Sequence, residues 1–432
     1  MLHPAVKPGP GQSERSADAR LQEAIGLAQA IGLEIVGTDI APLDRPNPAT
    51  FVGGGVVERL SAQAEETEAD LVVFDCMLSP GQQRNLERAL NRKVIDRTGL
   101  ILEIFGARAR TKEGRLQVDL AALTYQRSRL VRSWTHLERQ RSGGAFMGGP
   151  GERQIELDRR MLDEKIIRLK KDLEQVKRTR GLHRSARQKV PYPVVALVGY
   201  TNAGKSTLFN TLTRADVMAE DMLFATLDPT MRRLELASGE TIILSDTVGF
   251  ITDLPVHLVA AFRATLEEVI SADVIVHVRD VSDPEHEEQK ASVDAIMQDL
   301  GLGPGEAGER PVIEVFNKID LLEPEARAAL QAQCARDDHL VAVSALKGEG
   351  LPDLLEAVRQ GLQRDHEVLE LEVDAADGKT LAWLYQHGQV LDREEGDGHT
   401  WLRVSLSPIE RARFDRLPIQ QGEMGPSVSV EH

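Results

Sequence analysis

The strongest chemical signal in the sequence is the stretch GYTNAGKST, which begins at Gly199 and fits the pattern G-x-x-x-x-G-K-[ST]. It follows an apolar run and precedes a segment with helical spacing, which is the context that this phosphate-binding loop requires. Backbone N–H groups at a helix start bind phosphate, while Lys205 would meet the β- and γ-phosphates and Ser206 would bind Mg²⁺. The predicted nucleotide contacts of the loop are Gly199, Tyr200, Thr201, Asn202, Ala203, Gly204, Lys205, Ser206 and Thr207.

Two later segments supply the groups that a magnesium ion and a γ-phosphate need. In LFATLDPT (223–230), the Thr226 hydroxyl would complete Mg²⁺ coordination when γ-phosphate is present. In DTVG, Asp246 would reach the metal through water, and Gly249 would offer its N–H to the γ-phosphate. Thr226 and Gly249 are therefore predicted switch elements, and with Lys205 they are the predicted catalytic residues. The further predicted contacts are Phe224, Ala225, Thr226, Leu227, Asp228, Asp246, Thr247, Val248 and Gly249, with Ser206, Thr226 and Asp246 as Mg²⁺ ligands.

The motif NKID predicts that the bound base is guanine. The Asp320 carboxylate can accept two hydrogen bonds from guanine, at N1–H and at the exocyclic amine, and adenine offers no such pair. An unpaired carboxylate there would cost roughly 1–3 kcal/mol, which penalises ATP. Each motif alone is short, but their order and spacing behind the phosphate loop make coincidence a weak alternative. The predicted base contacts are Asn317, Lys318 and Asp320, with Ser344, Ala345 and Leu346 presenting a backbone N–H.

Phe250 follows DTVG directly, where many proteins of this kind place a glutamine that orients the attacking water. A phenyl ring cannot orient water, so the isolated domain is expected to hydrolyse GTP slowly. Three sources of the missing group stay open: another part of this chain, a partner or a bound cation.

Elements with two different periods must position these loops. Apolar runs that alternate with helical segments predict a doubly wound parallel sheet around the motifs. Shorter α/β patterns precede and follow it, and the last of them reads strand, helix, strand, helix. The predicted strands and helices before the motifs are LQEAIGLAQAIG (21–32, helix), LEIVGT (33–38, strand), ADLVVFD (69–75, strand) and NLERALNRK (85–93, helix). The predicted strands of the main sheet are VVALVGY, TIILSDT, DVIVHVRD, PVIEVFNKID and HLVAVSAL.

A different pattern separates the first two α/β parts. Leu116, Leu120, Leu123, Leu130, Trp134 and Leu137, and then Leu162, Ile166, Leu169, Leu173 and Val176, follow heptad spacing. Two long helices joined by the glycine-rich RSGGAFMGGPGE (141–152) are therefore predicted to form an antiparallel hairpin. From Arg127 to Lys189 there are 18 Lys and Arg against 8 Asp and Glu. These cations are either a solvated face or an RNA-binding face whose loop carries Phe146 and Met147, and both readings stay open.

The predicted architecture is α/β: a P-loop GTPase domain with an N-terminal α/β domain, a long antiparallel helical hairpin and a small C-terminal α/β domain. The predicted boundaries are 1–18 (disordered), 19–115 (N-terminal domain), 116–190 (basic hairpin), 191–362 (GTPase domain), 363–417 (C-terminal domain) and 418–432 (tail).

Composition narrows the class of protein. The 432 residues carry a formal net charge of −16, so the basic hairpin is a local exception on an acidic chain. Cys76 and Cys334 are far apart and have no metal-ligand spacing, which favours a reducing cytoplasm and predicts neither a disulfide framework nor a zinc site. No apolar run is long enough to span a membrane, and a monomer is expected because the hairpin can satisfy its own seams.

Several longer stretches match a known family: GQQRNLERAL (81–90), VIDRTGLILEIFGARARTKEGRLQVDLA (94–121), GGPGERQIELDRR (148–160), GYTNAGKSTLFN, LFATLDPT and DTVGFITDLPVHLVAAFRATLEE (246–268). With these residues the chain resembles the HflX family of ribosome-associated GTPases over nearly its whole length. The resemblance implies a GTP-binding switch that binds the large ribosomal subunit, including its RNA, and dissociates or rescues ribosomes under stress. It also implies that Ser142–Gly151 approaches the peptidyl-transferase region, and that the ribosome completes the site beside Phe250.

Two further points come from the resemblance. Asn202 occupies the position at which similar GTPases bind an activating K⁺, although an asparagine also suits the loop turn. Family members typically have G-S-G-K in the N-terminal domain, and some are reported to bind a second nucleotide there. This chain has Gly53-Gly54-Gly55-Val56, so the absence of the lysine argues against that activity here.

Three alternatives to the ribosome switch differ in what they require of the sequence. A GTPase acting on an assembly intermediate or on a tRNA-modifying complex is the first alternative, and the sequence motifs do not separate it from the leading one. A small-metabolite kinase would need an acceptor pocket and a base, for which the sequence offers no signal. A coiled-coil tether would use the hairpin without its cations, and replacing those cations separates it from an RNA-binding arm.

Overall fold

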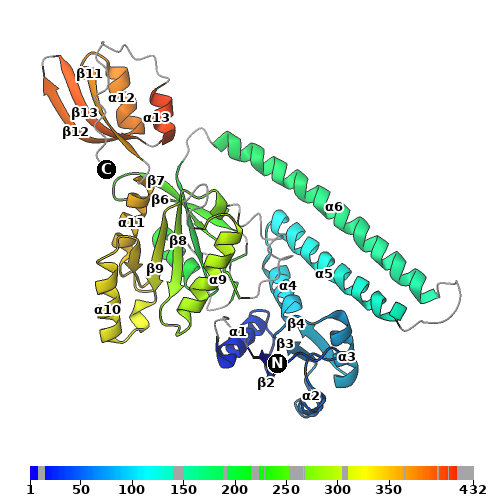
Figure 1. Ribbon diagram of the computed structural model, residues 1–432. Helices are drawn as coiled ribbons and strands as arrows, with labels where there is room; N and C mark the ends of the chain where they lie inside the picture. The colour runs from blue at the N-terminus through cyan, green and yellow to red at the C-terminus, as the bar shows by residue number, and fades with distance from the viewer. Residues whose placement is uncertain are drawn as a thin grey trace. The chain divides into compact units, whose positions relative to one another are not determined.

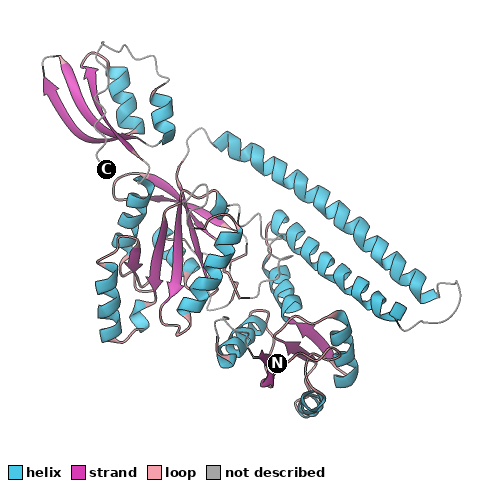
Figure 2. Cartoon of the chain, in the orientation of Figure 1, coloured by secondary structure: helices cyan, strands magenta, loops and turns pink. Residues whose placement is uncertain are grey.

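A computed structural model gives the fold of two compact units, Met1–Leu354 and Leu355–His432 (Figure 1). The predicted fold class is confirmed, because a parallel N-terminal sheet, a helical hairpin, a P-loop sheet and a small C-terminal sheet follow one another along the chain (Figure 2). The structure describes residues 1–7, 15–139, 150–187, 192–215, 223–224, 226–227, 229–252, 266, 268–303, 310–363, 366–396, 398–406 and 408–415.

The N-terminal sheet has four parallel strands in the order β2-β1-β3-β4. Its helices alternate with these strands, and α3 begins at a capping box in which Ser79 and Gln82 bind each other's backbone N–H groups. Its elements are β1 (Leu2–Val6), α1 (Ala17–Gln29), β2 (Asp39–Leu43), α2 (Gly54–Glu66), β3 (Leu71–Phe74), α3 (Pro80–Leu90), β4 (Lys93–Asp96) and α4 (Arg97–Arg108).

The start of the chain corrects part of the expectation that residues 1–18 are disordered, because Leu2–Val6 forms a strand. Strand β1 pairs with β2 along its whole length, and Leu2 is fully buried. Pro4 is tolerated inside a four-stranded sheet because β3 reaches β1 only at Leu2, so the missing N–H faces no neighbouring strand. A run of five residues that contains Pro and His gives no strand signal, and tertiary pairing decides its conformation.

The predicted strand LEIVGT (33–38) is wrong. These residues are not in any of the described strands, and β2 begins only at Asp39. Leu33 and Ile35 instead pack against the hydrophobic cluster beside α1 and α4. Their alternating apolar pattern therefore reflects a half-buried connection and not a ladder.

The predicted hairpin is formed by α5 (Lys112–Arg139) and α6 (Pro150–Arg187), which pack along each other. Ile166 is buried, and the other seam residues whose side chains are described are half-buried. The heptad pattern thus marks the faces that meet. Of the predicted loop Ser142–Gly151, only Pro150 and Gly151 are described, as the first residues of α6, and the rest lies outside the described residues.

Asp96 fastens the hairpin to the N-terminal domain. This fully buried carboxylate caps α4 by accepting from the Gly99 N–H at 2.8 Å, and it accepts from the Leu78 N–H at 3.1 Å. The Tyr125 hydroxyl and the Arg129 guanidinium of α5 each donate to it at 2.5 Å. A buried charge is stable when its lone pairs are used in this way, so α5 has a fixed attachment to the sheet.

The GTPase domain is built on six strands in the order β10-β9-β8-β5-β7-β6, of which only β6 runs antiparallel to its neighbour. The apolar pattern predicts the other five strands but not β6, whose residues TMRRLE are mostly polar. The elements are β5 (Val194–Gly199), α7 (Lys205–Thr213), β6 (Thr230–Glu235), β7 (Thr241–Asp246), β8 (Val274–Asp280), α9 (His286–Asp299), β9 (Val312–Asn317), η1 (Ile319–Leu321), α10 (Pro324–Cys334), β10 (Leu340–Ala342) and α11 (Leu351–Gln363).

The C-terminal unit is a three-stranded antiparallel sheet, β11-β13-β12, with two helices. Leu384, Leu402, Val404 and Phe414 belong to its core. The apolar pattern does not predict β12, because QVLDREEG carries polar residues on both faces. The elements are β11 (Glu367–Asp374), α12 (Gly378–His387), β12 (Gln389–Gly396), β13 (His399–Leu406) and α13 (Pro408–Phe414), and the predicted tail 418–432 lies outside the described residues.

The start of the C-terminal unit differs from the boundary that the sequence pattern predicts. The second compact unit begins at Leu355, inside α11, whereas the sequence placed a boundary after residue 362. Among the described residues, no helix is both long enough and apolar enough to cross a membrane.

A buried histidine in the main sheet gives a prediction about acid stability. Burial in β8 lowers the pKa of His277 to about 4, with Lys290 and Arg279 acting in the same direction against Asp294 and Glu314. The neutral form is therefore the folded form, and its stabilising effect is complete above the ordinary pKa of 6.5 and is lost as the pH falls toward 4. One such group changes the free energy of unfolding by at most about 1.4 kcal/mol per pH unit.

The measurement is thermal melting at pH values from 7 to 4.5, with and without His277→Gln. The substitution removes the titrating group, so the melting temperature should fall less steeply with acid than it does in the unsubstituted chain. His339→Gln, at an exposed position, is the matched control and should leave the slope unchanged. Equal slopes for His277→Gln and the unsubstituted chain would contradict the assignment.

Candidate nucleotide site

The four sequence motifs meet at one edge of the GTPase sheet. GYTNAGKST follows β5, DTVG follows β7, NKID follows β9 and SAL follows β10, all at the carboxyl ends of parallel strands. Ligands of open α/β sheets bind at this edge, next to the point where the strand order reverses. The predicted motifs are therefore brought together by the topology of the sheet.

The phosphate loop is held in shape by two glycines. Gly199 has φ 148°, and a Cβ there would lie 2.2 Å from the Val278 carbonyl oxygen. Gly204 has φ 91°, and a Cβ there would lie 2.2 Å from Asn317 Nδ2. No other residue fits either place. Helix α7 begins immediately after Gly204, so its first N–H groups point into the loop.

Three oxygen-bearing side chains form a tight triangle beside the loop. Ser206 Oγ donates to Asp246 Oδ2 at 2.7 Å, and Thr226 Oγ1 donates to the same oxygen at 2.8 Å. The two hydroxyl oxygens are 2.9 Å apart. Asp246 is fully buried, and its Oδ1 has no hydrogen-bond partner among the described residues.

This donor set fits a magnesium ion. Carboxylate and hydroxyl oxygens are ligands that Mg²⁺ accepts, and an orphaned buried carboxylate oxygen calls for a cation or a donor. Within the described part of the chain no cluster of three or more His, Cys, Asp or Glu is found, so phosphate oxygens and water would have to supply the remaining ligands. Burial raises the pKa of Asp246, while Lys205 and the two hydroxyls act against that rise.

Lys205 brings a buried positive charge to the same place. Its Nζ donates to the carbonyl oxygens of Tyr200 at 2.7 Å and Gly199 at 3.1 Å. Burial lowers the pKa of Lys205 to about 8, and the Asp246 carboxylate only partly offsets that effect. A phosphate anion would supply the negative charge that this buried ammonium group lacks.

The NKID segment ties the phosphate loop to the SAL loop. Asn317 Nδ2 donates to the Ala203 carbonyl at 2.8 Å, and the Ala345 N–H donates to Asn317 Oδ1 at 3.0 Å. The Ser344 hydroxyl donates to Asp320 Oδ1 at 2.6 Å, which fixes the orientation of that carboxylate. Of the three SAL residues, Leu346 is the one whose backbone N–H has no partner in the described part of the chain, and its side chain is exposed.

One residue that supports the NKID segment was not predicted from the sequence. Asp280, the last residue of β8, binds Lys318 Nζ at 2.6 Å and accepts from the Ser282 hydroxyl at 2.5 Å. Lys318 has φ 65°, an uncommon conformation for a lysine, so this ion pair holds a strained residue in place. The available signal was an acidic residue at the carboxyl end of a predicted strand, next to the other motifs.

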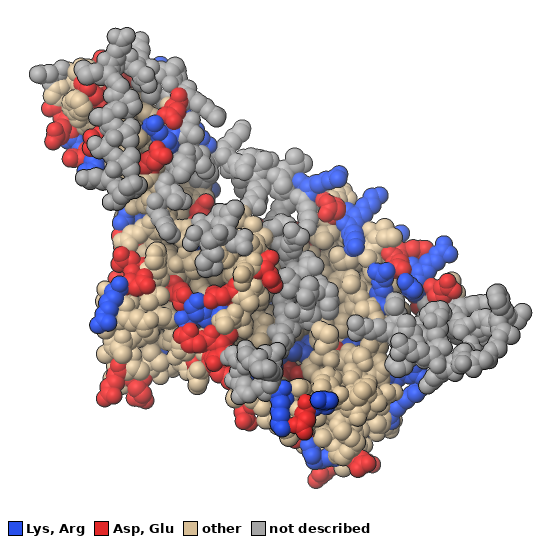
Figure 3. Space-filling view, viewed as in Figure 1, with Lys and Arg blue, Asp and Glu red and all other residues tan. Residues whose placement is uncertain are grey.

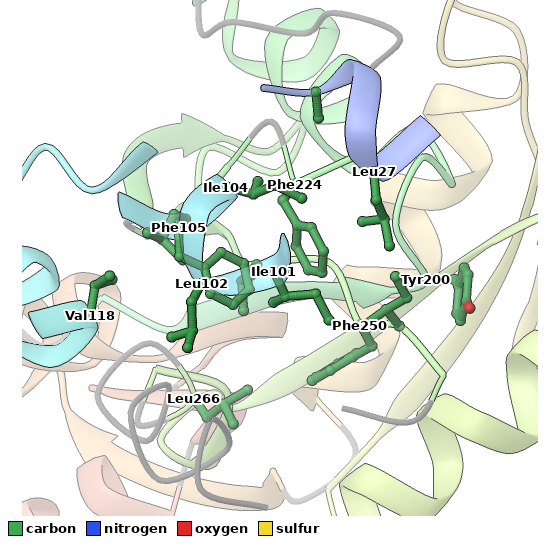
Figure 4. Close-up of a cluster of buried hydrophobic side chains, with 14 of the residues drawn as sticks. Leu27, Ile101, Leu102, Ile104, Phe105, Val118, Tyr200, Phe224, Phe250 and Leu266 are labelled. Atoms are coloured by element: carbon green, nitrogen blue, oxygen red, sulfur yellow. The ribbon is translucent and has the colours of Figure 1, made fainter. Parts of the chain in front are cut away.

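Phe250 faces away from the phosphate loop. Its backbone extends the sheet, because its N–H donates to the Gly199 carbonyl at 3.1 Å and its carbonyl accepts from the Thr201 N–H at 2.8 Å. Its ring is buried in a cluster to which Leu27 of α1 and Ile101 of α4 also belong (Figure 4). Phe250 is apolar because the N-terminal domain packs on it.

The segment before β6 joins the same cluster. Phe224 packs edge-on against Phe105 of α4, with ring centroids 4.8 Å apart, and Leu227 is buried in the cluster as well. Both predicted switch segments therefore carry apolar side chains into a cluster that α1 and α4 share with the GTPase domain. Ala225 and Asp228, two of the predicted contacts, lie outside the described residues.

A buried polar network lies beside this cluster. The Tyr200 hydroxyl donates to Glu23 at 2.5 Å and accepts from Arg15 at 2.9 Å, and the Thr252 N–H donates to it at 3.0 Å. Arg97 binds both Glu23 and Asp75. Burial, with Glu23 beside it, raises the pKa of Tyr200 above its usual range. The Tyr200 side chain is thus engaged with the N-terminal domain and does not point toward a nucleotide through its hydroxyl.

The remaining predicted contacts divide into lining and supporting residues. Asn202 is exposed at the tip of the loop with φ 62°. Thr247 is buried and donates to the Leu197 carbonyl at 2.6 Å, and Val248 is part of the hydrophobic cluster, so both support the loop from behind. Thr207 is half-buried in the first turn of α7.

Comparison with known proteins covers nearly the whole chain. Family models match residues 18–106 (GTP-binding GTPase N-terminal), 108–187 (GTP-binding GTPase middle region), 194–318 (50S ribosome-binding GTPase) and 329–425 (HflX C-terminal domain). The chain is 54% identical to the GTPase HflX of Magnetococcus marinus over 91% of its own length and 89% of that protein. It is 43% identical to the GTPase HflX of Escherichia coli over 91% of each.

One solved structure aligns with most of the chain. A GTP-binding protein from Sulfolobus solfataricus in complex with GDP aligns with 84% of this chain and 99% of its own, with 23% identity and a TM-score of 0.42.

Proposed function

The chain belongs to the HflX family of 50S ribosome-binding GTPases, and on that premise we propose that it is a GTP-driven switch that dissociates or rescues ribosomes under stress. The observation that carries the proposal is the convergence of Ser206, Thr226 and Asp246 on one point beside a P-loop lysine. This arrangement of oxygen ligands beside a lysine suits a magnesium-bound triphosphate, and NKID adds a carboxylate that can bind guanine.

In this proposal the residues of the loop have separate tasks. Lys205 and the first N–H groups of α7 bind the β- and γ-phosphates, and the Gly249 N–H donates to the γ-phosphate. Ser206, Thr226 and, through water, Asp246 hold the magnesium ion. When bound, Mg²⁺ neutralises charge that develops on the phosphate oxygens. Asp320 accepts hydrogen bonds from guanine while the Ser344 hydroxyl fixes the orientation of this carboxylate. The backbone N–H of Leu346 donates to the guanine oxygen.

Coupling to a partner follows from where the switch residues lie. In the proposal, Thr226 contacts the metal and Gly249 contacts the γ-phosphate only while that phosphate is present, so hydrolysis removes both contacts. Phe224 and Phe250 link these same segments to α1 and α4. Loss of the γ-phosphate would therefore alter contacts with the N-terminal domain. The hairpin is attached to that domain by the hydrogen bonds of α5 to Asp96.

The hairpin is the proposed contact with ribosomal RNA. Lys and Arg side chains are spread along α6 (Figure 3). Lys165, Arg168, Lys170, Lys171 and Arg178 are exposed, and no described residue forms an ion pair with them. Exposed cations that pair with no described residue are suited to bind a phosphate backbone.

The test is GTP turnover by the purified chain, alone and with purified large ribosomal subunits, in potassium and in sodium buffer. Turnover alone should be slow, because Phe250 offers no group for water, and subunits should stimulate it strongly. Lys205→Ala is the control and should abolish turnover under all conditions. Fast turnover without subunits would place the missing group within the chain, and co-sedimentation with precursor particles instead of mature subunits would favour a role in assembly.

A further inference from the structure

One buried hydroxyl at the site is not used by any contact that holds the fold. Thr201, the third residue of the phosphate loop, is only 5% exposed. Its Oγ1 has no hydrogen-bond partner among the residues that the structure describes. Buried hydroxyls are nearly always paired, so an orphan of this kind points to a ligand or a water that belongs there.

The position of Thr201 within the site is defined by two neighbours. A Cβ built on Gly249 would lie 2.8 Å from Thr201 Cγ2, 2.9 Å from Thr201 Cα and 3.2 Å from Lys205 Nζ. The side chain of Thr201 therefore stands against the Gly249 backbone, beside the lysine that meets the γ-phosphate in the proposed function. These three residues converge on the same small region.

The Thr201 backbone is fixed, which makes its side chain a reliable positioning group. Its N–H donates to the Phe250 carbonyl at 2.8 Å, and the Phe250 N–H donates to the Gly199 carbonyl at 3.1 Å. These two bonds join the phosphate loop to the segment after β7. Any group that Thr201 presents is thus held at a constant distance from Gly249.

The residue that commonly orients water is replaced by Phe250, whose ring is buried in the hydrophobic cluster. We propose that the Thr201 hydroxyl orients the water that attacks the γ-phosphate. This inference rests on the proposed function, and it names a residue of this chain as the source of intrinsic hydrolysis. A ribosomal partner could supply a further group at the site, and that group would act in addition to the Thr201 hydroxyl.

The chemical step is the hydrolysis of GTP. The water oxygen forms a bond to the γ-phosphorus, and the bond between that phosphorus and the β–γ bridging oxygen breaks, so its electron pair leaves with GDP. The Thr201 hydroxyl accepts a hydrogen bond from the water and keeps its own proton. The protons of the water end on the inorganic phosphate and in solvent. Orientation alone is required, because a threonine hydroxyl is too weak a base to remove a proton.

A purely structural role is the alternative, in which the Thr201 methyl group packs on Gly249. Two substitutions separate these roles. Thr201→Val keeps the shape and the methyl groups but removes the hydroxyl, whereas Thr201→Ser keeps the hydroxyl and removes the methyl. Thr213→Val is a matched control, because the Thr213 hydroxyl donates to the Phe209 carbonyl of its own helix, at 2.7 Å.

Single-turnover GTP hydrolysis without ribosomes and the affinities for GDP and a non-hydrolysable GTP analogue are the measurements. Thr201→Val should slow hydrolysis about tenfold, the effect of losing one hydrogen bond, and leave both affinities within about twofold. Thr201→Ser should hydrolyse GTP within about threefold of the unsubstituted rate, and Thr213→Val should match it.

Each result decides the inference. Normal hydrolysis by Thr201→Val, or equal loss in the valine and serine variants, would overturn it and leave the proposed GTPase switch intact. A loss of nucleotide affinity in Thr201→Val equal to its loss of rate would show a binding role and overturn it too. Failure of the unsubstituted chain to bind GTP would instead overturn the proposed function on which the inference depends.

Discussion

Replacing Asp320 with asparagine should weaken GTP binding at least about a hundredfold and create binding of xanthosine triphosphate. Guanine presents two donors to the Asp320 carboxylate, and asparagine offers one acceptor and one donor. The donor of the amide would face the exocyclic amine of guanine, so a charge-assisted bond is replaced by two opposed donors. Sites built for a hydrogen bond discriminate strongly against a ligand that leaves it unmade.

Xanthine carries a carbonyl oxygen where guanine carries the amine, so it pairs with the asparagine amide. The Ser344 hydroxyl, which donates to Asp320 Oδ1 at 2.6 Å, should hold the amide oxygen in the same orientation. The measurement is competition of GDP and xanthosine diphosphate against a fluorescent guanine nucleotide. Asp338→Asn, an exposed change of the same charge, is the control. Equal weakening toward both bases would mean that the loop, and not the base contact, had been lost.

Local motifs account for most of what the sequence predicts about the site. A phosphate loop is built from adjacent residues whose backbone N–H groups bind the ligand, so its residue types appear together in GYTNAGKST. NKID and SAL are equally local, and strand runs of buried apolar residues place them at one sheet edge. Ser206, Thr226 and Asp246 are predicted as Mg²⁺ ligands because each belongs to one of three such local motifs.

Contacts between distant segments left no signal that a single sequence could reveal. Phe250 belongs to the same buried cluster as Leu27 and Ile101, and the Tyr200 hydroxyl binds Glu23, although in each case more than a hundred residues separate the residues concerned. Such pairs follow no period, and an apolar Phe250 reads in the sequence only as a missing glutamine. The structure gives it a positive role, because it anchors the segment after β7 to the N-terminal domain.

Three strands are not predicted from the sequence because they lack a strong apolar pattern. Strands β1, β6 and β12 carry Pro, Arg or Glu and have little apolar alternation, so their conformation depends on pairing with a stronger neighbour. LEIVGT shows the converse, since its alternation is real but no neighbouring strand accepts it. The pattern thus predicts strands with a run of apolar residues well, and strands rich in polar residues or Pro poorly.

Removing three cations from the outer face of α6 should weaken binding to large ribosomal subunits about a hundredfold. Arg168, Lys171 and Arg178 are exposed and lie on the side of the helix opposite the seam. Each cation that contacts a phosphate releases counterions and contributes up to about tenfold in affinity at 0.1 M salt. The triple change to glutamine keeps helix propensity and leaves the seam intact.

The measurement is co-sedimentation with purified large subunits over a range of KCl concentrations. The slope of log affinity against log salt should fall by about one for each phosphate contact removed. The control replaces Arg45, Arg336 and Lys379, three exposed cations outside the hairpin, and so removes the same total charge. Intrinsic GTP turnover should be unchanged in both variants, since none of these residues is near the nucleotide site.

The salt slope separates the two readings of the hairpin that the sequence left open. A structural tether or dimerisation arm binds through its apolar seam, so the triple variant would keep both its affinity and its salt dependence. An arm that binds RNA must lose both, and the control with the same net charge must not, because only cations close to phosphates release counterions. If the control variant weakens binding to the large subunit as much as the hairpin variant does, the affinity depends on the overall charge of the protein. The hairpin would then not be the RNA-binding element.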